Sequence, residues 1–176
     1  MCRQFAFLLE AGTDERWDDL SVTTAAGKEF CVLDRIERDE DSLFTEEIDE
    51  QLELIERAKP EPGVDWVRDY LAQTNTIYAT RYLSAAFNAD GDLPGPADIL
   101  WSIAGIVGGI LQADGESISN EEGYAVVLQF ADDAVGEWAV ALLQPDGTWK
   151  TGKIELGDAS HIAAFESGLL PVTALD

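Results

Sequence analysis

The stretch YAVVLQFADDAVGEWAVALLQPDGTWKTGKIEL, residues 124–156, sets the fold class of this 176-residue chain. Three runs within it, at 124–131, 137–144 and 148–156, are apolar or alternating and have the length of strands. The two connections between them are short and rich in Asp, Gly and Pro, which favours tight turns. We therefore predict a three-stranded antiparallel meander.

A second strand pair is expected near the N-terminus. Residues 20–24 (LSVTT) are rich in β-branched side chains, and residues 28–36 (KEFCVLDRI) alternate between apolar and polar types. Gly27 follows two alanines between these runs and can turn the chain. A β-hairpin across Gly27 is the expected outcome, whereas residues 3–10 are ambiguous between a strand and a short helix.

Helices are expected between the two groups of strands. Ile48, Leu52 and Ile55 recur at helical spacing after Thr45, which we take as the N-cap of a first helix. A second helix should begin near Gly63 and continue to about Phe87, with a kink or break allowed at the weak triplet 74–76. A third should cover about 97–112, after the breaker-rich loop 88–96.

The last expected element is a short helix capped by Asp158, running through Phe165 and ended by Gly168. The whole pattern predicts an α+β fold, in which an antiparallel sheet (the N-terminal hairpin plus the C-terminal three-stranded meander) packs against two or three central helices. We expect residues 1–176 to form a single acidic α+β domain.

The charge distribution constrains function more than any motif does. The formal net charge is −24, and no Lys or Arg occurs between Tyr82 and Trp149. A hydrophobic content of 46% and five tryptophans nevertheless indicate a folded chain. Because such an anionic surface repels phosphates, we expect no direct binding of nucleic acid.

Two explanations for the acidity stay open. In the first, the protein is a small acidic binding or inhibitor protein that docks on a basic partner (a nuclease, a toxin or a DNA-binding machine), with mimicry of nucleic acid as the extreme form. This is the charge and size of immunity or anti-defence proteins. In the alternative, the protein is salt-adapted, its charge has no binding role, and it has an unrecognised enzymatic or structural role.

The binding hypothesis assigns a partner-binding surface of acids and two tryptophans that we expect to be partly exposed. An exposed tryptophan with an acidic rim is a reasonable hot spot for a basic partner, although both could instead pack over a sheet edge. The assigned residues are Trp17, Asp18, Asp19, Asp39, Glu40, Asp41, Glu46, Glu47, Asp132, Asp133 and Trp149.

Motifs for other chemistry are weak. Asn88, Asp90 and Asp92 begin like a calcium loop, but Leu93 and Ile99 occupy the positions of its glycine and its glutamate, so a turn is favoured over a cation site. The pair of Cys31 with His161, the only histidine, is the remaining nucleophile hypothesis. Pairing of Cys2 with Cys31 is left open. We expect no catalytic residue, no metal site and no cofactor, and the sequence leaves the oligomeric state open.

The run ILWSIAGIVGGIL at 99–111 requires a comparison with membrane spans. It has 13 residues, fewer than the roughly 20 that a span needs, and acids flank it. A fully buried core helix is the favoured interpretation, so no membrane contact is expected. A cytoplasmic location is the default expectation, because the five apolar residues at 5–9 are too few for a signal peptide.

Overall fold

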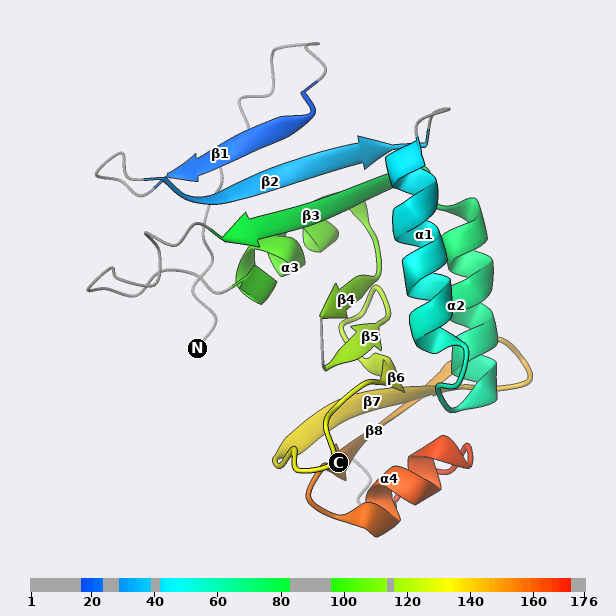
Figure 1. Ribbon diagram of the computed structural model, residues 1–176. Helices are drawn as coiled ribbons and strands as arrows, with labels where there is room; N and C mark the ends of the chain where they lie inside the picture. Colours follow the sequence, from blue (N-terminus) through cyan, green and yellow to red (C-terminus); the bar gives the residue numbers. More distant parts are fainter. Residues whose placement is uncertain (1–16, 24–28, 39–41, 83–95, 114–115, 172–176) are drawn as a thin grey trace. The chain divides into compact units, whose positions relative to one another are not determined.

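The computed structural model describes residues 17–23, 29–38, 42–82, 96–113 and 116–171 (Figure 1). The chain divides into two compact units. Unit 1 takes residues 1–44 and 75–107, and unit 2 takes residues 45–74 and 108–176. The fold class is α+β, with a sheet in each unit rather than the one sheet expected from the sequence.

Unit 1 is built on a three-stranded antiparallel sheet in the order β1-β2-β3 (Figure 1). β1 (Asp19–Thr23) and β2 (Glu29–Glu37) pair with Leu20 opposite Leu33, which confirms the predicted hairpin. β3 (Thr76–Tyr82) then pairs with β2, placing Tyr78 opposite Arg35. Cys31 and Leu33 are buried on one face of this sheet.

The third strand of unit 1 corrects the prediction of a helix continuing to Phe87. α2 (Glu61–Gln73) ends before the triplet 74–76, and the chain enters β3 at Thr76. Thr, Ile and Tyr side chains suit a strand, and pairing with β2 supplies backbone hydrogen bonds that a helix would otherwise have made internally. The predicted continuation of the helix beyond residue 76 was therefore wrong.

α3 (Pro96–Val107) packs against β3 and is shorter and more exposed than expected. Gly108, with φ of +68°, follows the helix, and the chain then forms β4 (Leu111–Ala113) instead of continuing to residue 112. Ile99 is buried, but Ile106 is 64% exposed. The interpretation of this segment as a fully buried core helix is wrong.

Unit 2 contains a mixed sheet in the order β4-β5-β6-β7-β8. Its strands are β4, β5 (Ser117–Ser119), β6 (Ala125–Leu128), β7 (Glu137–Leu143) and β8 (Trp149–Glu155). β7 and β8 form the expected antiparallel hairpin, with Val140 opposite Gly152. β6 instead runs parallel to β7 through the single pairing of Ala125 with Val140.

The predicted meander is therefore wrong at its first connection. β6 takes its antiparallel partner from β5, a short polar strand (SIS) that the sequence pattern did not reveal. Residues 129–136 carry the chain back before β7 begins, and Gln129 N–H donates to Glu116 O at the start of this return. Because the chain reverses twice, the strands on either side end up parallel.

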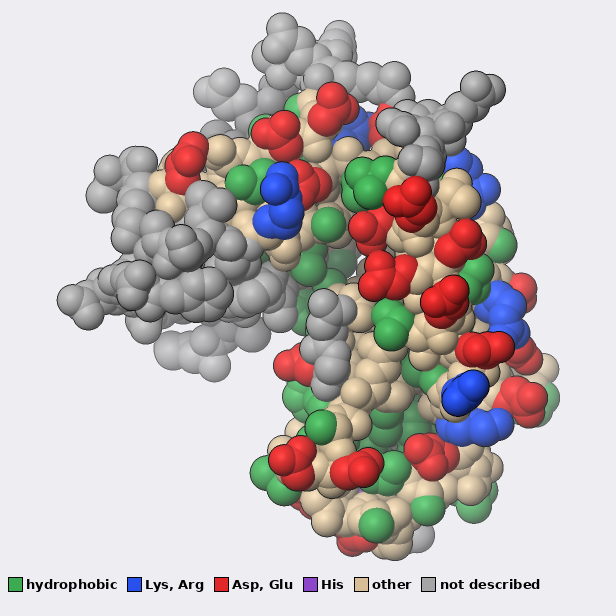
Figure 2. Space-filling model, in the orientation of Figure 1, with side chains coloured by type: hydrophobic (Ala, Val, Ile, Leu, Met, Phe, Trp, Pro, Cys, Tyr) green, Lys and Arg blue, Asp and Glu red, His purple; other side chains and the backbone are tan. Residues whose placement is uncertain are grey.

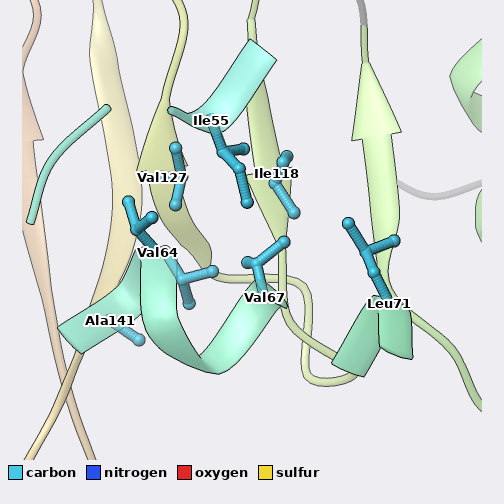
Figure 3. Packing of buried hydrophobic residues seen from close by; sticks show 8 residues of the cluster. Ile55, Val64, Val67, Leu71, Ile118, Val127 and Ala141 are labelled. Atoms are coloured by element: carbon cyan, nitrogen blue, oxygen red, sulfur yellow. The ribbon is translucent and has the colours of Figure 1, made fainter. Parts of the chain in front are cut away.

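Helices cover both faces of this sheet (Figure 1). α1 (Ser42–Ile55) and α2 contribute Ile55, Val64, Val67 and Leu71 to a core against Ile118, Val126, Val127 and Ala141 (Figure 3). On the other face, Phe165 of α4 (Ala159–Glu166) is fully buried against β7 and β8. A two-sided core explains why β6 is apolar along its whole length rather than alternating.

Two predicted helix caps fare differently. α1 begins at Ser42, so Thr45 lies inside the helix and is not its N-cap. Asp158 caps α4 as predicted: its carboxylate accepts from the Ser160 N–H at 2.8 Å. Gly168, at φ of +78°, follows the helix. Within the described residues, no helix is both long and apolar enough to cross a membrane.

Candidate partner-binding surface

Trp17, in unit 1, lies next to Arg35 and Tyr78. Its ring is 6.1 Å from the ring of Tyr78, and the Arg35 guanidinium carbon lies 5.8 Å from the Trp17 ring centre. Glu37 is ion-paired with Arg35. Trp17 is half-buried in this contact, so it packs on the unit while keeping one side open.

The acids next to Trp17 belong to the edge of the same sheet. Asp18 and Asp19 are exposed, and the Asp18 carbonyl accepts from the Arg35 N–H at 2.7 Å. Asp19 lies opposite Asp34 in the strand register, and Arg81 donates two hydrogen bonds to Asp34 on that face, at 2.6 and 2.8 Å. Asp39, Glu40 and Asp41 lie outside the described residues.

α1 places most of its acids on one exposed stripe. Glu46, Glu50 and Glu53 follow one another at spacings of four and three residues, and all three are exposed. Glu47 is half-buried beside them. No Lys or Arg occurs in the helix. In Figure 2 the acidic side chains follow α1 along its exposed side.

The sequence analysis assigned electrostatic steering to the whole segment 34–56, but from this stripe it named only Glu46 and Glu47 as partner-binding residues. The acids that it did not name are Asp49, Glu50 and Glu53, with exposed Leu54 (47%) next to them. The exposure of these acids could have been predicted, because the apolar stripe at 48, 52 and 55 identifies the buried face of the helix and hence the exposed one. We refer to Glu46, Asp49, Glu50 and Glu53 as the α1 acidic face.

Asp132 and Asp133 occupy the exposed turn between β6 and β7. This turn is held by the bond from Ala134 N–H to Ala131 O, and Val135 after it is 78% exposed. The next residue, Gly136, donates to a carboxylate oxygen of Glu155 at 2.7 Å. The two aspartates are therefore displayed at one end of the sheet, and neither makes a side-chain bond that the structure records.

Trp149 lies at the start of β8 in an aromatic cluster with two residues of α2. The rings of Trp66 and Trp149 meet edge to face at 5.0 Å, and Tyr70 lies 5.4 Å from Trp66. All three rings are half-buried. Trp66 and Trp149 pack against the edge of the core that α1 and α2 form with the sheet. The buried side of the cluster therefore contributes to the stability of unit 2.

A tight turn brings a carboxylate to this cluster. Asn120 is buried, and its Oδ1 accepts from two backbone N–H groups, those of Glu122 at 3.1 Å and Tyr124 at 3.0 Å. The neighbouring Glu121 is thereby held where its carboxylate accepts from the Tyr70 hydroxyl at 3.3 Å. Burial and then the Glu121 charge raise the pKa of Tyr70, so the hydroxyl keeps its proton and donates it.

Sequence reasoning missed Trp66, Tyr70 and Glu121 as members of a site. Trp66 and Tyr70 stand four residues apart, so one helix face was predictable for them. Glu121 is 51 residues from Tyr70, and only the folded chain brings them together. The term aromatic cluster is used below for Trp66, Tyr70 and Trp149.

Cys31 and His161, the residues of the nucleophile hypothesis, both lie in surroundings that do not favour catalysis. Cys31 is fully buried, and burial followed by the Asp34 charge raises the pKa of its thiol, which disfavours the nucleophilic thiolate. His161 Nδ1 accepts from the Glu155 N–H at 3.0 Å, tying α4 to the end of β8. Cys2, Asn88, Asp90 and Asp92 lie outside the described residues, and the described ones contain no group that could hold a metal ion.

Comparisons with known protein families, with curated proteins and with solved structures give no match to this chain. The functional argument therefore depends on the geometry and charge of the surfaces described above.

Proposed function

We propose that this protein is an acidic binding protein that docks on a basic surface of another protein, and that the α1 acidic face steers the encounter. The partner class that fits is a nuclease, a toxin or a DNA-binding protein, whose cationic groove would otherwise receive phosphates. Mimicry of a nucleic acid is the extreme form of this mode. Binding of such a partner would block that groove.

The scarcity of basic residues among the acids of unit 2, above all on α1, is the observation that carries the proposal. Unit 2 has 21 acids against 5 basic residues, a net charge of −16, whereas unit 1 has 14 against 6, a net charge of −8. The α1 helix contributes five of these acids and no basic residue. Concentrated charge of one sign raises the association rate with the opposite charge.

A charge-matched pair of variants tests where the steering originates. One variant carries Glu46→Gln and Glu50→Gln on α1, and the other carries Glu116→Gln and Glu166→Gln elsewhere on unit 2. All four side chains are exposed, and both variants have a net charge of −22 instead of −24. The probe is a fluorescein-labelled octalysine peptide, and stopped-flow fluorescence measures its association rate at several salt concentrations.

We expect the α1 variant to associate several-fold more slowly than the control variant at low salt, with the difference lost above about 0.3 M salt because screening is then short-ranged. Equal rates in both variants would mean that only net charge matters, and the α1 acidic face would lose its role. Melting the protein across a KCl series separates the salt-adapted alternative. A fold that collapses below roughly molar KCl would support that alternative against binding.

A further inference from the structure

Unit 1 contains a four-residue arrangement that shows how this chain binds a guanidinium group. Trp17 and Tyr78 lie ring to ring, Arg35 lies over Trp17, and Glu37 is ion-paired with Arg35. The 5.8 Å separation between the guanidinium carbon and the Trp17 ring centre is within the range of a cation–π contact. The arginine thus lies over a tryptophan, is ion-paired with a carboxylate, and is opposite the tyrosine in the strand register.

Unit 2 repeats three of these four parts. Trp66 and Tyr70 are tilted by 47° at 5.4 Å, close to the 40° and 6.1 Å of Trp17 and Tyr78. The carboxylate is Glu121, hydrogen-bonded to the Tyr70 hydroxyl. Trp149 adds a second indole at right angles to Trp66.

Three of the five basic residues of unit 2 are ion-paired elsewhere or point away from the aromatic cluster. Arg68 is ion-paired with Asp65, and Lys153 with Glu137. Lys150 pairs with Leu142 in the strand register, so it leaves from the α4 side of the sheet, opposite to Trp149. In the described part of unit 2, no guanidinium or ammonium group is recorded over a ring of the aromatic cluster.

We infer that the aromatic cluster with Glu121 is the recognition site for an arginine side chain of the basic partner. This inference rests on the proposed function and specifies its chemistry. The guanidinium plane stacks on the exposed side of Tyr70 or Trp66, while its N–H groups donate to the Glu121 carboxylate. Asn120 fixes the turn that presents Glu121, and it has a positioning role.

Arginine suits this site better than lysine for two reasons. Its planar group stacks on an aromatic ring and is more weakly hydrated than an ammonium group, so it loses less on leaving water. Its fork of donors also matches a carboxylate with two parallel hydrogen bonds. The acids of α1 attract both residues equally, so a preference for arginine reports on the aromatic cluster.

Two labelled peptides of equal charge test the inference on the full chain. One is octalysine, and the other has a central lysine replaced by arginine; fluorescence anisotropy gives the two dissociation constants. The variant is Glu121→Gln, and its matched control is Glu122→Gln, the next residue in the same turn, also exposed and with the same change of charge. A second variant, Tyr70→Leu, removes an aromatic face at a half-buried position.

We expect the unmodified protein to bind the arginine peptide about threefold to tenfold more tightly, because the guanidinium stacks on a ring and makes two charge-assisted hydrogen bonds, whereas the ammonium group makes a single point contact. Glu121→Gln and Tyr70→Leu should bring that ratio close to one, whereas Glu122→Gln should weaken both peptides equally and keep it. A ratio near one in the unmodified protein, or equal effects of Glu121→Gln and Glu122→Gln, would overturn the arginine site and leave the proposed function standing. Failure of both peptides to bind at low salt would overturn both.

Discussion

Gly63 should be a position where alanine destabilises a helix, against the usual effect of this substitution. It lies in the first turn of α2, where the helix approaches the backbone of β6 closely. A Cβ built on Gly63 would lie 2.5 Å from the carbonyl oxygen of Val126 and 3.4 Å from its carbonyl carbon. Because the obstacle is the backbone of a buried strand, no side-chain rotation can relieve the contact.

The expected loss in the free energy of unfolding follows from these distances. Ordinary carbon–oxygen contacts begin near 3.3 Å, so α2 or β6 must move by roughly 0.8 Å. Overpacking of this kind costs about 1–3 kcal/mol, and the gain in helix propensity from Gly to Ala offsets about 0.5–1 kcal/mol of it. We expect Gly63→Ala to lower the free energy of unfolding by about 0.5–2 kcal/mol.

Urea denaturation followed by circular dichroism and tryptophan fluorescence measures this change, since Trp66 and Trp149 lie near the affected contact. Gly105→Ala in α3 is the matched control: nothing lies within 4 Å of its added Cβ, so the propensity gain should stand alone and stabilise by about 0.5–1 kcal/mol. If Gly63→Ala were as stabilising as Gly105→Ala, α2 could not pack on β6 at the distance described.

Three further predictions concern unit 2. Asn120→Ala removes a buried acceptor from two backbone N–H groups, and we expect the free energy of unfolding to fall by about 1–3 kcal/mol in urea denaturation. Phe165→Ala should cost about 3–5 kcal/mol because the ring is fully buried, whereas Leu169→Ala, 63% exposed, should stay within about 0.5 kcal/mol. Hydrogen bonds from Ser160 hold the pKa of Asp158 below its ordinary value, so its contribution is complete above about pH 4 and lost as the pH falls through the folded-state pKa. The melting temperature of Asp158→Ala should therefore lie below that of the unmodified protein at pH 6, and the difference should shrink as the pH falls below about 4.

An element could be predicted from the sequence wherever its own residues determine its structure. The β7–β8 hairpin has a turn in which Asp146 accepts from Thr148, and the α4 helix has its own cap and stop, so both were predictable. β3 was not, because residues 76–82 can follow either a helical or an extended pattern and only pairing with β2 selects the strand. The antiparallel pairing of β6 with β5 was not predictable either, because the three residues of β5 are too few to show a periodic pattern.

The candidate surfaces also differ in whether they depend on local sequence or on contacts between distant segments. The α1 acidic face follows from helical spacing, so its position could be predicted once the apolar stripe was identified. The aromatic cluster could not, because it joins α2, β8 and a turn held by a buried asparagine. A surface assigned from the sequence alone therefore over-represents charge, which is visible residue by residue, and under-represents aromatic contacts, which form only on folding.

This difference bears on how the protein would discriminate among basic partners. Exposed carboxylates attract any cation with little regard to its shape, and their effect on affinity fades as salt rises. A half-buried set of rings with one oriented carboxylate is less sensitive to salt and depends on the geometry of the cation. If the two surfaces act as proposed, raising the salt should weaken binding of every basic peptide yet leave the ratio between the arginine and lysine peptides nearly constant. A ratio that fell to one together with the affinity would show that charge alone selects the partner.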